Sequence, residues 1–389
     1  MNHRFWQFSL FLTCSYSLTA AAIPNPAGTM IPSPPQLSAK AWVLMDATSA
    51  NVITEQNSEE HLPPASLTKL MTVYVATNEI QAQRLKPDDL VTISENAWKT
   101  GGSRMFLDPR SQVSVQDLLK GIVIDSGNDA SVALSEHIAG SEDAFAGVMN
   151  STAQRLAMTH THFMNPTGLP DPEHYSSAQD MATLARAIIT DESAYYPLYA
   201  HKYFTWNGIR QPNRNLLLWR DPSVDGLKTG HTEAAGYCMV TSAVRNGTRL
   251  IAVVFGSTTL ENRAADTQKL LTYGFRFFDT QTYEKAGQVL GQPRLWKGQD
   301  DTLKVGLLHD MTLTLPKNPS RKVSTRLQLN EPLLAPLAAG ASVGTLELLD
   351  GDQVLSTQPL VALQPAEAGG WWTVAWDSMK LFFVGLLGG

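Results

Sequence analysis

Cysteine is scarce in this sequence of 389 residues, which contains only Cys14 and Cys238. Cys14 lies in an N-terminal segment that we expect to be removed, so the mature chain would keep Cys238 alone and form no internal disulfide. A chain of this length can be stabilised by its hydrophobic core without such cross-links. Its 43% of hydrophobic and 17% of charged residues are typical of a globular protein and argue against disorder.

Positive charge is also scarce, because 30 Lys and Arg residues face 36 Asp and Glu residues and give a formal net charge of −6. A nucleic-acid partner is therefore not expected, since binding to phosphates requires a basic patch. The histidines His160 and His162 have no carboxylate partner at the spacing of a metal site, so we interpret them as surface side chains. We expect neither a metal ion nor another cofactor.

Apolar runs long enough to cross a membrane are missing. The N-terminal run, from Phe5 to Leu18, is shorter than the roughly 20 apolar residues that a spanning helix needs. Arg4 precedes this run and Ala20-Ala21-Ala22 follows it, which is the pattern of a secretory signal peptide. We predict that residues 1–22 are a signal peptide and that the protein is exported. A buried N-terminal helix is the alternative.

The next part of the chain predicts an α+β domain over residues 38–285, after a proline-rich lead-in at 23–37. Two strand pairs are expected near its ends, and the second pair flanks Asn246-Gly247, which suits a type I′ turn. These four strands are expected to form one antiparallel sheet. Between the strand pairs, apolar residues recur at helical spacing. The predicted strands are 41–46, 51–54, 237–244 and 249–255, and the predicted helices are 66–77, 115–125, 129–138, 143–158, 178–190 and 263–278.

From residue 290 the pattern changes to short strand-like runs broken by Pro, Gly and Asp, which predicts a small all-β domain over residues 290–368. The last segment, 371–389, is rich in Trp and Phe. On a helical projection Thr373, Asp377 and Lys380 form a narrow polar ridge opposite the aromatic side chains. We predict an amphipathic helix that lies in the membrane interface through residues 371–387. Docking of this helix on the β domain is the alternative.

One pair of residues predicts nucleophilic catalysis. Ser66 and Lys69 are three residues apart at the predicted start of a helix, which places both side chains on one face. A serine hydroxyl needs a base to become a good nucleophile. Lysine can be that base only when it is neutral, and working near pH 7 requires that its pKa fall by roughly 3 units. Burial and a second cation both lower the pKa, so the sequence should supply another positive group.

Two further segments complete the pattern. Lys228-Thr229-Gly230 precedes a predicted strand and can run along a sheet edge, where Lys228 is the second cation and Thr229 can bind a substrate carboxylate. Gly230 would let the substrate backbone approach closely. Ser126 can relay a proton, and Asn128 can bind a substrate amide. Asp125 precedes Ser126 and is interpreted as a solvated helix end, with tuning of the pocket as the alternative.

The order Ser-x-x-Lys, Ser-x-Asn, Lys-Thr-Gly resembles the motifs of the penicillin-binding proteins and serine β-lactamases. The wider sequence is similar to the low-molecular-mass D-alanyl-D-alanine carboxypeptidases over nearly its whole length. The resemblance implies a β-lactamase/transpeptidase-like domain, built from an antiparallel sheet and a helical subdomain, then a β-rich domain and a C-terminal membrane anchor. The matching segments are 64–72, 105–107, 126–130, 165–169, 225–232 and 234–237.

The same resemblance implies roles for individual residues. Ser66 is acylated by a peptidoglycan stem peptide ending in D-Ala-D-Ala, or by a β-lactam antibiotic as covalent inhibitor, and Lys69 is the general base. The backbone N–H groups of Ser66 and His231 form the oxyanion hole. Arg263 resembles an arginine that helps to hold the substrate carboxylate, although its neighbours differ from the family pattern. The resemblance also implies a location on the periplasmic face of the inner membrane.

Three functions compete. The first is a serine-type D-Ala-D-Ala carboxypeptidase in cell-wall maturation, with DD-endopeptidase activity as a variant of it. The second is a β-lactamase, which is disfavoured because no Glu between the second and third motifs has an Asn four positions later. The third is a non-catalytic penicillin-binding wall protein, against which the intact Ser66, Lys69 and Lys228 argue.

Overall fold

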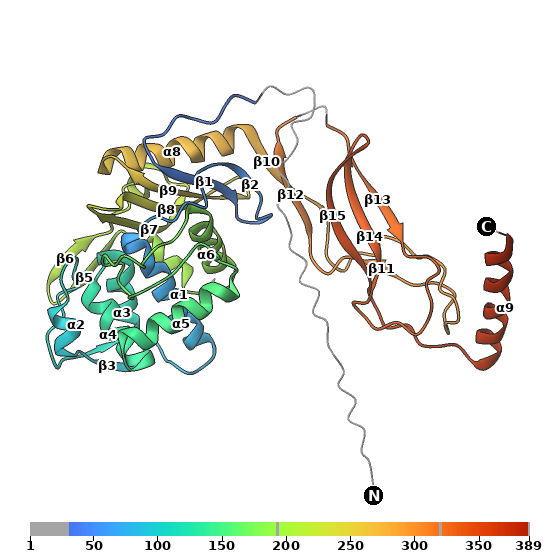
Figure 1. Ribbon diagram of the computed structural model, residues 1–389, viewed down its shortest axis with the longest axis horizontal. Helices are drawn as coiled ribbons and strands as arrows, with labels where there is room; N and C mark the ends of the chain where they lie inside the picture. The colour runs from blue at the N-terminus through green and yellow to red at the C-terminus, as the bar shows by residue number, and fades with distance from the viewer. Residues whose placement is uncertain (1–30, 192–193, 319–320, 388–389) are drawn as a thin grey trace, which may run out of the picture.

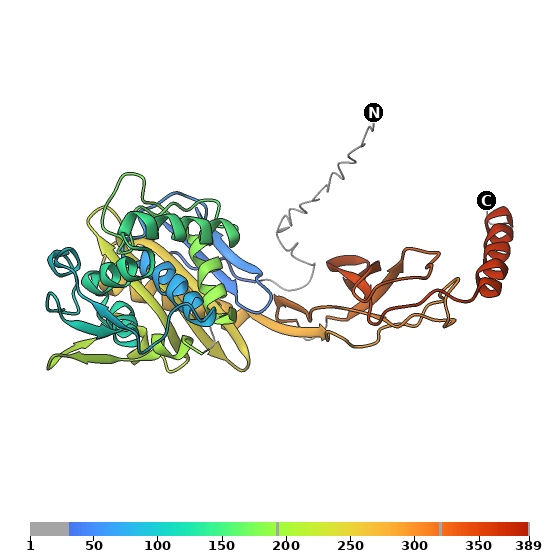
Figure 2. The same cartoon turned by 90° about the horizontal axis from the view of Figure 1, so that it is seen from below.

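A computed structural model describes residues 31–191, 194–318 and 321–387. The predicted signal peptide, residues 1–22, lies outside the described residues. The molecule is elongated: an α+β domain forms one end, a group of β-strands follows, and a single helix forms the other end (Figures 1 and 2). The residues at the start of the description, 31–37, run along helix α8, where the Tyr273 hydroxyl donates to the Pro32 carbonyl at 3.0 Å.

The centre of the α+β domain is a five-stranded antiparallel sheet in the order β2-β1-β9-β8-β7. The four strands predicted from the sequence lie in this one sheet, and β7 is added at its edge. Asn246 and Gly247 both have positive φ, at 49° and 81°, as a type I′ turn requires. The strands are β1 (Ala41–Asp46), β2 (Val52–Gln56), β7 (Val224–Thr232), β8 (Gly236–Arg245) and β9 (Thr248–Ser257).

Helices cover both faces of this sheet. Helix α8 packs on one face, where Leu270 and Leu271 join a core with Val254 of β9. The other face packs on helices α1 to α6 in a larger core (Figure 1). The helices are α1 (Lys69–Gln81), α2 (Glu95–Lys99), α3 (Val115–Lys120), α4 (Asn128–Ala139), α5 (Glu142–Arg155), α6 (Ala178–Asp191), α7 (Leu217–Arg220) and α8 (Leu260–Phe277).

Some elements differ from the sequence-based expectations. The helix predicted over 115–125 is α-helical only to Lys120, and Gly121–Asp125 is a π-helical turn. Short strands that the hydrophobic pattern did not reveal also occur, because each is only three or four residues long. They pair as β3 (Leu90–Thr92) with β4 (Gln112–Ser114) and β5 (Tyr203–Trp206) with β6 (Ile209–Pro212).

The second part of the molecule is built from strands alone. Strand β10 (Phe278–Glu284) begins where α8 ends and pairs with β12 (Met311–Pro316). At this junction Asp46 of β1 accepts a hydrogen bond of 2.7 Å from Thr280, and Thr314 lies 3.0 Å from Thr280. A four-stranded sheet follows in the order β11-β15-β14-β13, with β11 (Val305–Gly306), β13 (Val323–Leu329), β14 (Ser342–Asp350) and β15 (Gln353–Ala362).

The chain closes with helix α9 (Trp371–Leu387), at the end of the molecule farthest from the α+β domain (Figure 1). Asp377 is buried, and it accepts a hydrogen bond of 2.7 Å from the backbone N–H of Lys297. The aromatic side chains are uncovered, with Trp371, Trp372 and Phe382 each about two-thirds exposed. Part of the polar ridge therefore joins the helix to the β domain. In the described ranges, no helix combines the length and apolar character that a membrane crossing needs.

Candidate active site

Ser66 lies in a short 3-10 helix, η1 (Ala65–Thr68), that leads directly into α1. Ala65 has a φ of +47°, an unfavourable conformation for a residue with a Cβ atom, and it turns the chain immediately before Ser66. The Ser66 side chain is accessible, whereas Leu67 and Thr68 are buried. Ser66 is therefore at a helix start, as the sequence predicted.

Lys69 is fully buried behind Ser66. Its Nζ atom lies 3.1 Å from Ser66 Oγ and donates to Asn128 Oδ1 at 2.6 Å and to the Thr167 carbonyl at 2.5 Å. Burial, and next the positive charge of Arg214, lower the pKa of Lys69 from 10.5 to about 7, against an opposing effect of Asp129. The amine therefore deprotonates near neutral pH while it is in hydrogen-bond contact with the hydroxyl.

Ser126 and Lys228 form a second pair on the other side of the site. Ser126 ends the π-helical turn in a left-handed conformation, with a φ of +61°, and Lys228 Nζ donates to its Oγ at 2.9 Å. Burial is the main reason that the pKa of Lys228 lies well below its usual value, and the charges of Lys69 and Arg214 act in the same direction. The structure thus brings Lys69 close enough to Lys228 for the charge of Lys69 to lower the pKa of Lys228.

Strand β7 lies at the edge of the sheet and carries the third motif. Thr229 is buried and pairs with Met239, while His231 pairs with Tyr237 and is exposed. A Cβ atom on Gly230 would lie 2.9 Å from the Pro64 carbonyl oxygen and 3.2 Å from the Ser66 backbone nitrogen. Gly230 is therefore required for the contact between β7 and the Ser66 segment, a reason that differs from the predicted approach of substrate.

Arg263, near the start of α8, is buried behind β7. Its guanidinium donates to the carbonyl oxygens of Gly230 and Arg214, both at 3.4 Å. Burial lowers the pKa of Arg263 to about 10, so it remains charged at neutral pH. Its contacts fix the backbone on both sides of the site, and the carboxylate contact expected from the sequence stays a prediction.

Arg214 is the main site residue that the sequence reasoning missed. It lies in the loop between β6 and α7, is exposed, and donates to Ser103 Oγ at 2.7 Å. Ser103 also accepts a 2.7 Å hydrogen bond from the backbone N–H of Asn128 through its carbonyl oxygen. Arg214 is the cation that lowers the pKa of Lys69, so it takes the role of second cation that the sequence analysis assigned to Lys228. No motif marks Arg214, since loop positions carry no periodic pattern.

Asp125 is not a solvated helix end, which corrects the first of the two interpretations. It is 2% exposed, and neither carboxylate oxygen has a hydrogen-bond partner. Burial raises its pKa to about 7, although the charge of Arg214 opposes that shift. A carboxyl group next to Ser126 therefore remains largely protonated up to neutral pH, which agrees with the alternative of pocket tuning.

The loop of residues 165–169 packs against the segment that carries Ser66 and against the start of α1. Thr72 Oγ1 donates to the Pro166 carbonyl at 2.7 Å, next to the Thr167 carbonyl that binds Lys69. Gly168 has a φ of +79°, and a Cβ atom there would collide with the Ala65 carbonyl. The sequence marked this segment only through its resemblance to a family, and its role depends on this close packing.

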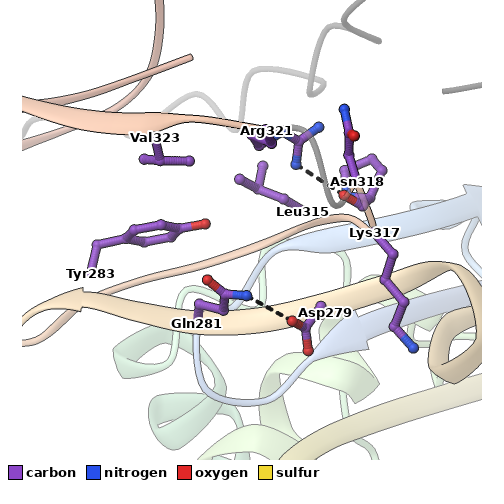
Figure 3. A pocket seen from close by; sticks show the side chains of 9 residues that line it. Asp279, Gln281, Tyr283, Leu315, Lys317, Asn318, Arg321 and Val323 are labelled. Carbon is purple, nitrogen blue, oxygen red and sulfur yellow. Dashed lines mark hydrogen bonds between the residues drawn. The ribbon is translucent and has the colours of Figure 1, made fainter. Parts of the chain in front are cut away.

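A separate cleft lies at the junction of β10, β12 and β13 (Figure 3). Several of its polar side chains bind within the protein: Gln281 donates to Asp279 at 2.8 Å, and Arg321 donates to the Pro316 carbonyl and to Asp350, both at 3.0 Å. The cleft contains no nucleophile paired with a base, and none of the three sequence motifs reaches it. We therefore place the chemistry at Ser66.

Comparison with known proteins identifies the family of this chain. The sequence model of the family described as D-alanyl-D-alanine carboxypeptidase, peptidase S11, matches residues 28–259. This chain belongs to that family. A second model, described as penicillin-binding protein 5, C-terminal domain, matches residues 278–368. The predicted class, a serine-type D-Ala-D-Ala carboxypeptidase, is that of the family, and the α+β fold followed by an all-β domain is confirmed.

Individual members of the D-alanyl-D-alanine carboxypeptidase family are similar over most of their length. DacA of Escherichia coli (strain K12) is 44% identical over 91% of this chain and 90% of its own. The structure of penicillin binding protein 5 from Haemophilus influenzae has a TM-score of 0.83 and 41% identity, covering 86% of this chain and 99% of that one. Penicillin-binding protein D2 from Listeria monocytogenes, in an ampicillin-bound form, has a TM-score of 0.57 and 30% identity, covering 61% and 98%.

Proposed function

We propose that the protein removes the terminal D-alanine from peptidoglycan stem peptides through an acyl-enzyme on Ser66. The observation that carries this proposal is the pair formed by Ser66 Oγ and Lys69 Nζ, which are 3.1 Å apart. A buried lysine with a pKa of about 7 can accept the hydroxyl proton at neutral pH. Membership of a family of carboxypeptidases supports the choice of substrate.

Acylation begins when neutral Lys69 takes the proton from Ser66 Oγ. The oxygen then attacks the carbonyl carbon of the penultimate D-Ala, and the backbone N–H groups of Ser66 and His231 stabilise the oxyanion. The C–N bond breaks, and the departing amine of the terminal D-Ala receives the proton that Lys69 accepted, relayed through the Ser126 hydroxyl. Lys69 is then neutral again, and Ser126 Oγ is held by a 2.9 Å hydrogen bond from Lys228 Nζ. The products of this half-reaction are the acyl-enzyme and free D-Ala.

The carboxylate of the terminal D-Ala would bind at the cationic side of the site. Thr229 offers a hydroxyl on β7, and Arg214 offers an exposed guanidinium. Arg263 adds positive charge from behind the strand while it binds the Gly230 carbonyl. Asn128, which is bonded to Lys69 through its oxygen, would bind the amide of the preceding stem residue.

In the second half-reaction a water molecule attacks the acyl-enzyme, with Lys69 as the base. We propose that a β-lactam acyl group leaves slowly. Within the described residues no carboxylate is hydrogen-bonded to Ser66 or Lys69, and the position beside Lys69 is filled by the Thr167 carbonyl. A β-lactamase of the type that uses a glutamate-activated water would need such a carboxylate.

A labelled penicillin and a pentapeptide ending in D-Ala-D-Ala test this function. Wild type should retain the label and release D-Ala, and Ser66→Ala should lose both. Ser223→Ala, which changes a serine far from Ser66 in the sequence, is the matched control and should keep both. Label without D-Ala release would contradict the carboxypeptidase and favour an endopeptidase or a penicillin sensor, whereas release of hydrolysed penicillin within seconds would favour a β-lactamase.

The location is part of the same proposal. We propose that residues 1–22 direct export, and that α9 attaches the protein to the outer face of the cytoplasmic membrane, lying in its interface. The support is the row of uncovered aromatic side chains on α9, which includes Trp376 at 57% and Phe383 at 53% exposed. Trp and Phe side chains of this kind bind at the boundary between headgroups and acyl chains.

A further inference from the structure

Asp125 is a buried carboxyl group that the chemistry described above does not use. It ends the π-helical turn Gly121–Asp125 and directly precedes Ser126, whose hydroxyl is bonded to Lys228. The residue is 2% exposed, and in the described part of the chain neither carboxylate oxygen has a hydrogen-bond partner. An ionised carboxylate in such a position is costly, because it has lost its water without gaining a partner. Asp125 is therefore neutral unless a cation pairs with it.

The two lysines of the site are already bound to other groups. Lys228 Nζ donates to Ser126 Oγ at 2.9 Å and to the Thr229 carbonyl at 3.0 Å. Lys69 Nζ has three hydrogen bonds within the site. A movement of either amine toward Asp125 would break these bonds, so neither lysine is its natural partner.

The cations that α3 and β6 bring to this region are engaged as well. Lys120 of α3 donates to Asp117 at 2.7 Å. Arg210 of β6 stacks on Tyr203 of β5, at 3.7 Å from the ring centroid. No positive charge comes from the phenols of the short helix η3 (Tyr196–Ala200), which are Tyr196 and Tyr199.

Arg214 is the cation that is placed to respond to Asp125. It lies in the loop between β6 and α7 and is exposed, and its bond to Ser103 Oγ at 2.7 Å uses only one of the five N–H groups of a guanidinium. Burial raises the pKa of Asp125 to about 7, the charge of Arg214 opposes this shift, and the charge of Asp129 adds to it. Asp129 has the same sign as Asp125 and accepts hydrogen bonds from two backbone N–H groups. An ionised Asp125 therefore attracts Arg214.

Arg214 is also a proposed contact of the substrate's terminal carboxylate. Two carboxylates then compete for one guanidinium, that of the substrate and that of Asp125. A protonated Asp125 has no charge with which to compete, whereas an ionised Asp125 draws the guanidinium toward the protein interior. The groups that form and break bonds, Ser66 and Lys69, take no part in this competition.

We propose that Asp125 is a positioning residue that acts through Arg214. Its protonated form leaves the guanidinium to the substrate carboxylate, and its ionised form withdraws it, so that the affinity for anionic substrates falls as Asp125 ionises. This inference rests on the proposed carboxypeptidase function and adds a pH-dependent control of substrate affinity at the same site.

Steady-state release of D-Ala from diacetyl-lysyl-D-Ala-D-Ala at pH 6 and pH 9 tests the proposal, in wild type and in Asp125→Asn. At pH 6, below the pKa of Asp125 at about 7, residue 125 is neutral in both proteins, so KM should be the same. At pH 9, KM of wild type should be about five- to tenfold higher than that of Asp125→Asn, the effect of weakening one hydrogen bond. The two proteins should have the same kcat at each pH. Comparing them at one pH cancels the titration of Lys69, which both contain.

Further variants and one probe sharpen the test. Asp125→Ser, which is also neutral, should behave like Asp125→Asn and checks that the result does not depend on one side chain. In an Arg214→Ala background, Asp125→Asn should no longer change KM at pH 9, because no guanidinium is left to withdraw. Asp143→Asn, which changes an exposed acid on α5, is the matched control and should have wild-type KM at both pH values.

Benzylpenicillin methyl ester reports on the carboxylate directly, because its carboxyl group is blocked. Its rate of acylation of Ser66 at pH 9 should be equal in wild type and Asp125→Asn, whereas benzylpenicillin itself, below saturation, should acylate Asp125→Asn faster. A methyl ester that follows the same pattern as the free acid would contradict a competition between carboxylates.

The outcomes separate this inference from the proposed function. Equal KM of wild type and Asp125→Asn at pH 9 would overturn the role of Asp125 and leave the carboxypeptidase function intact. A difference of the same size at pH 6 and pH 9 would also refute it, since a change in packing and not in charge would be the cause. A difference that persists in the Arg214→Ala background would refute the route through Arg214. Absence of D-Ala release by wild type, with Ser66 still acylated by benzylpenicillin, would overturn the carboxypeptidase function and the inference with it.

Discussion

Lys69 combines two effects that act on one amine. Removal from water disfavours its charged form, and Arg214 adds repulsion, so that the pKa falls from 10.5 to about 7. A shift of this size corresponds to about 5 kcal/mol of preference for the neutral amine. Hydrogen bonds to Asn128 and to the Thr167 carbonyl hold Nζ within 3.1 Å of Ser66. The lysine is thus both positioned and available as a base at neutral pH.

The rate of acylation by penicillin should therefore depend on pH. We expect it to rise with pH through about 7, because only neutral Lys69 accepts the Ser66 proton. Arg214→Ala removes a positive charge, so the pKa of Lys69 and the midpoint of the profile should move to higher pH. Arg214→Lys keeps the charge and should shift the midpoint less. Stopped-flow acylation between pH 5 and 9 measures the profile, and an identical midpoint in Arg214→Ala would contradict the assigned effect.

At the scale of elements, the Ser66 segment depends on a loop from another part of the chain. His174 lies below η1, with Nε2 at 2.8 Å from Thr68 Oγ1, and its Nδ1 accepts a 3.2 Å hydrogen bond from the Met164 N–H. Since Nδ1 accepts, Nε2 carries the proton of the neutral ring and donates to Thr68. Burial is the largest effect that lowers the pKa of His174, which falls to about 4. Protonation would break the contact with Met164.

This buried ring predicts a loss of stability in mild acid. The pKa is about 4 in the folded state and 6.5 when unperturbed, so below pH 6.5 the unfolded state binds the proton first. The contribution is complete above pH 6.5, and about 2 kcal/mol of it is lost between pH 7.5 and pH 5. The difference between wild type and His174→Ala in urea unfolding at the two pH values measures this loss, because the raised pKa of Asp125 changes stability in the opposite direction over the same range.

Two variants check the assignment to His174. His174→Ala should be less stable at pH 7.5 but should show a smaller decrease between the two pH values. His162→Ala, which changes a partly exposed histidine nearby, should keep the full decrease. An unchanged decrease in His174→Ala would show that other groups cause the acid sensitivity.

The elements that the sequence predicted well are those with a strong local pattern. The Asn246-Gly247 hairpin and the helices α4 and α6 follow from turn chemistry and apolar spacing, and they occur within a few residues of the predicted bounds. The positions of Ser66, Lys69, Ser126 and Lys228 in one site followed from the motifs. Arg214 and the Thr167 carbonyl could not be predicted in the same way, since contacts of a loop or a backbone oxygen depend on tertiary packing rather than on residue type.

For the whole molecule, the main feature is the separation of the site from α9. The sequence offered two alternatives for this helix, an interfacial anchor or a helix docked on the β domain. The structure agrees in part with docking on the β domain, because Asp377 binds the backbone of Lys297. The aromatic side chains, however, are uncovered. The polar contact joins the helix to the β domain, and the aromatic face is uncovered.

Truncation after Gly370 should release the protein from membranes without loss of acylation by penicillin. The expected reason is that the uncovered Trp and Phe side chains provide the binding energy. Co-sedimentation with lipid vesicles measures the fraction of bound protein. The double variant Trp372→Ala with Phe382→Ala, in the full chain, should also lower this fraction. Retention of the truncated protein on vesicles would place the membrane contact elsewhere in the chain.

The connection between α8 and β10 limits the positions that Ser66 can reach. The strand continues from the helix without a loop, and Asp46, Thr280 and Thr314 bind across the junction. If α9 lies in the membrane, the β domain acts as a spacer of fixed length. Ser66 then reaches only those stem peptides that lie in a thin layer of the wall, at one distance from the membrane. Lengthening the spacer should then change which layer loses its terminal D-alanine, while kcat/KM for a soluble peptide stays the same.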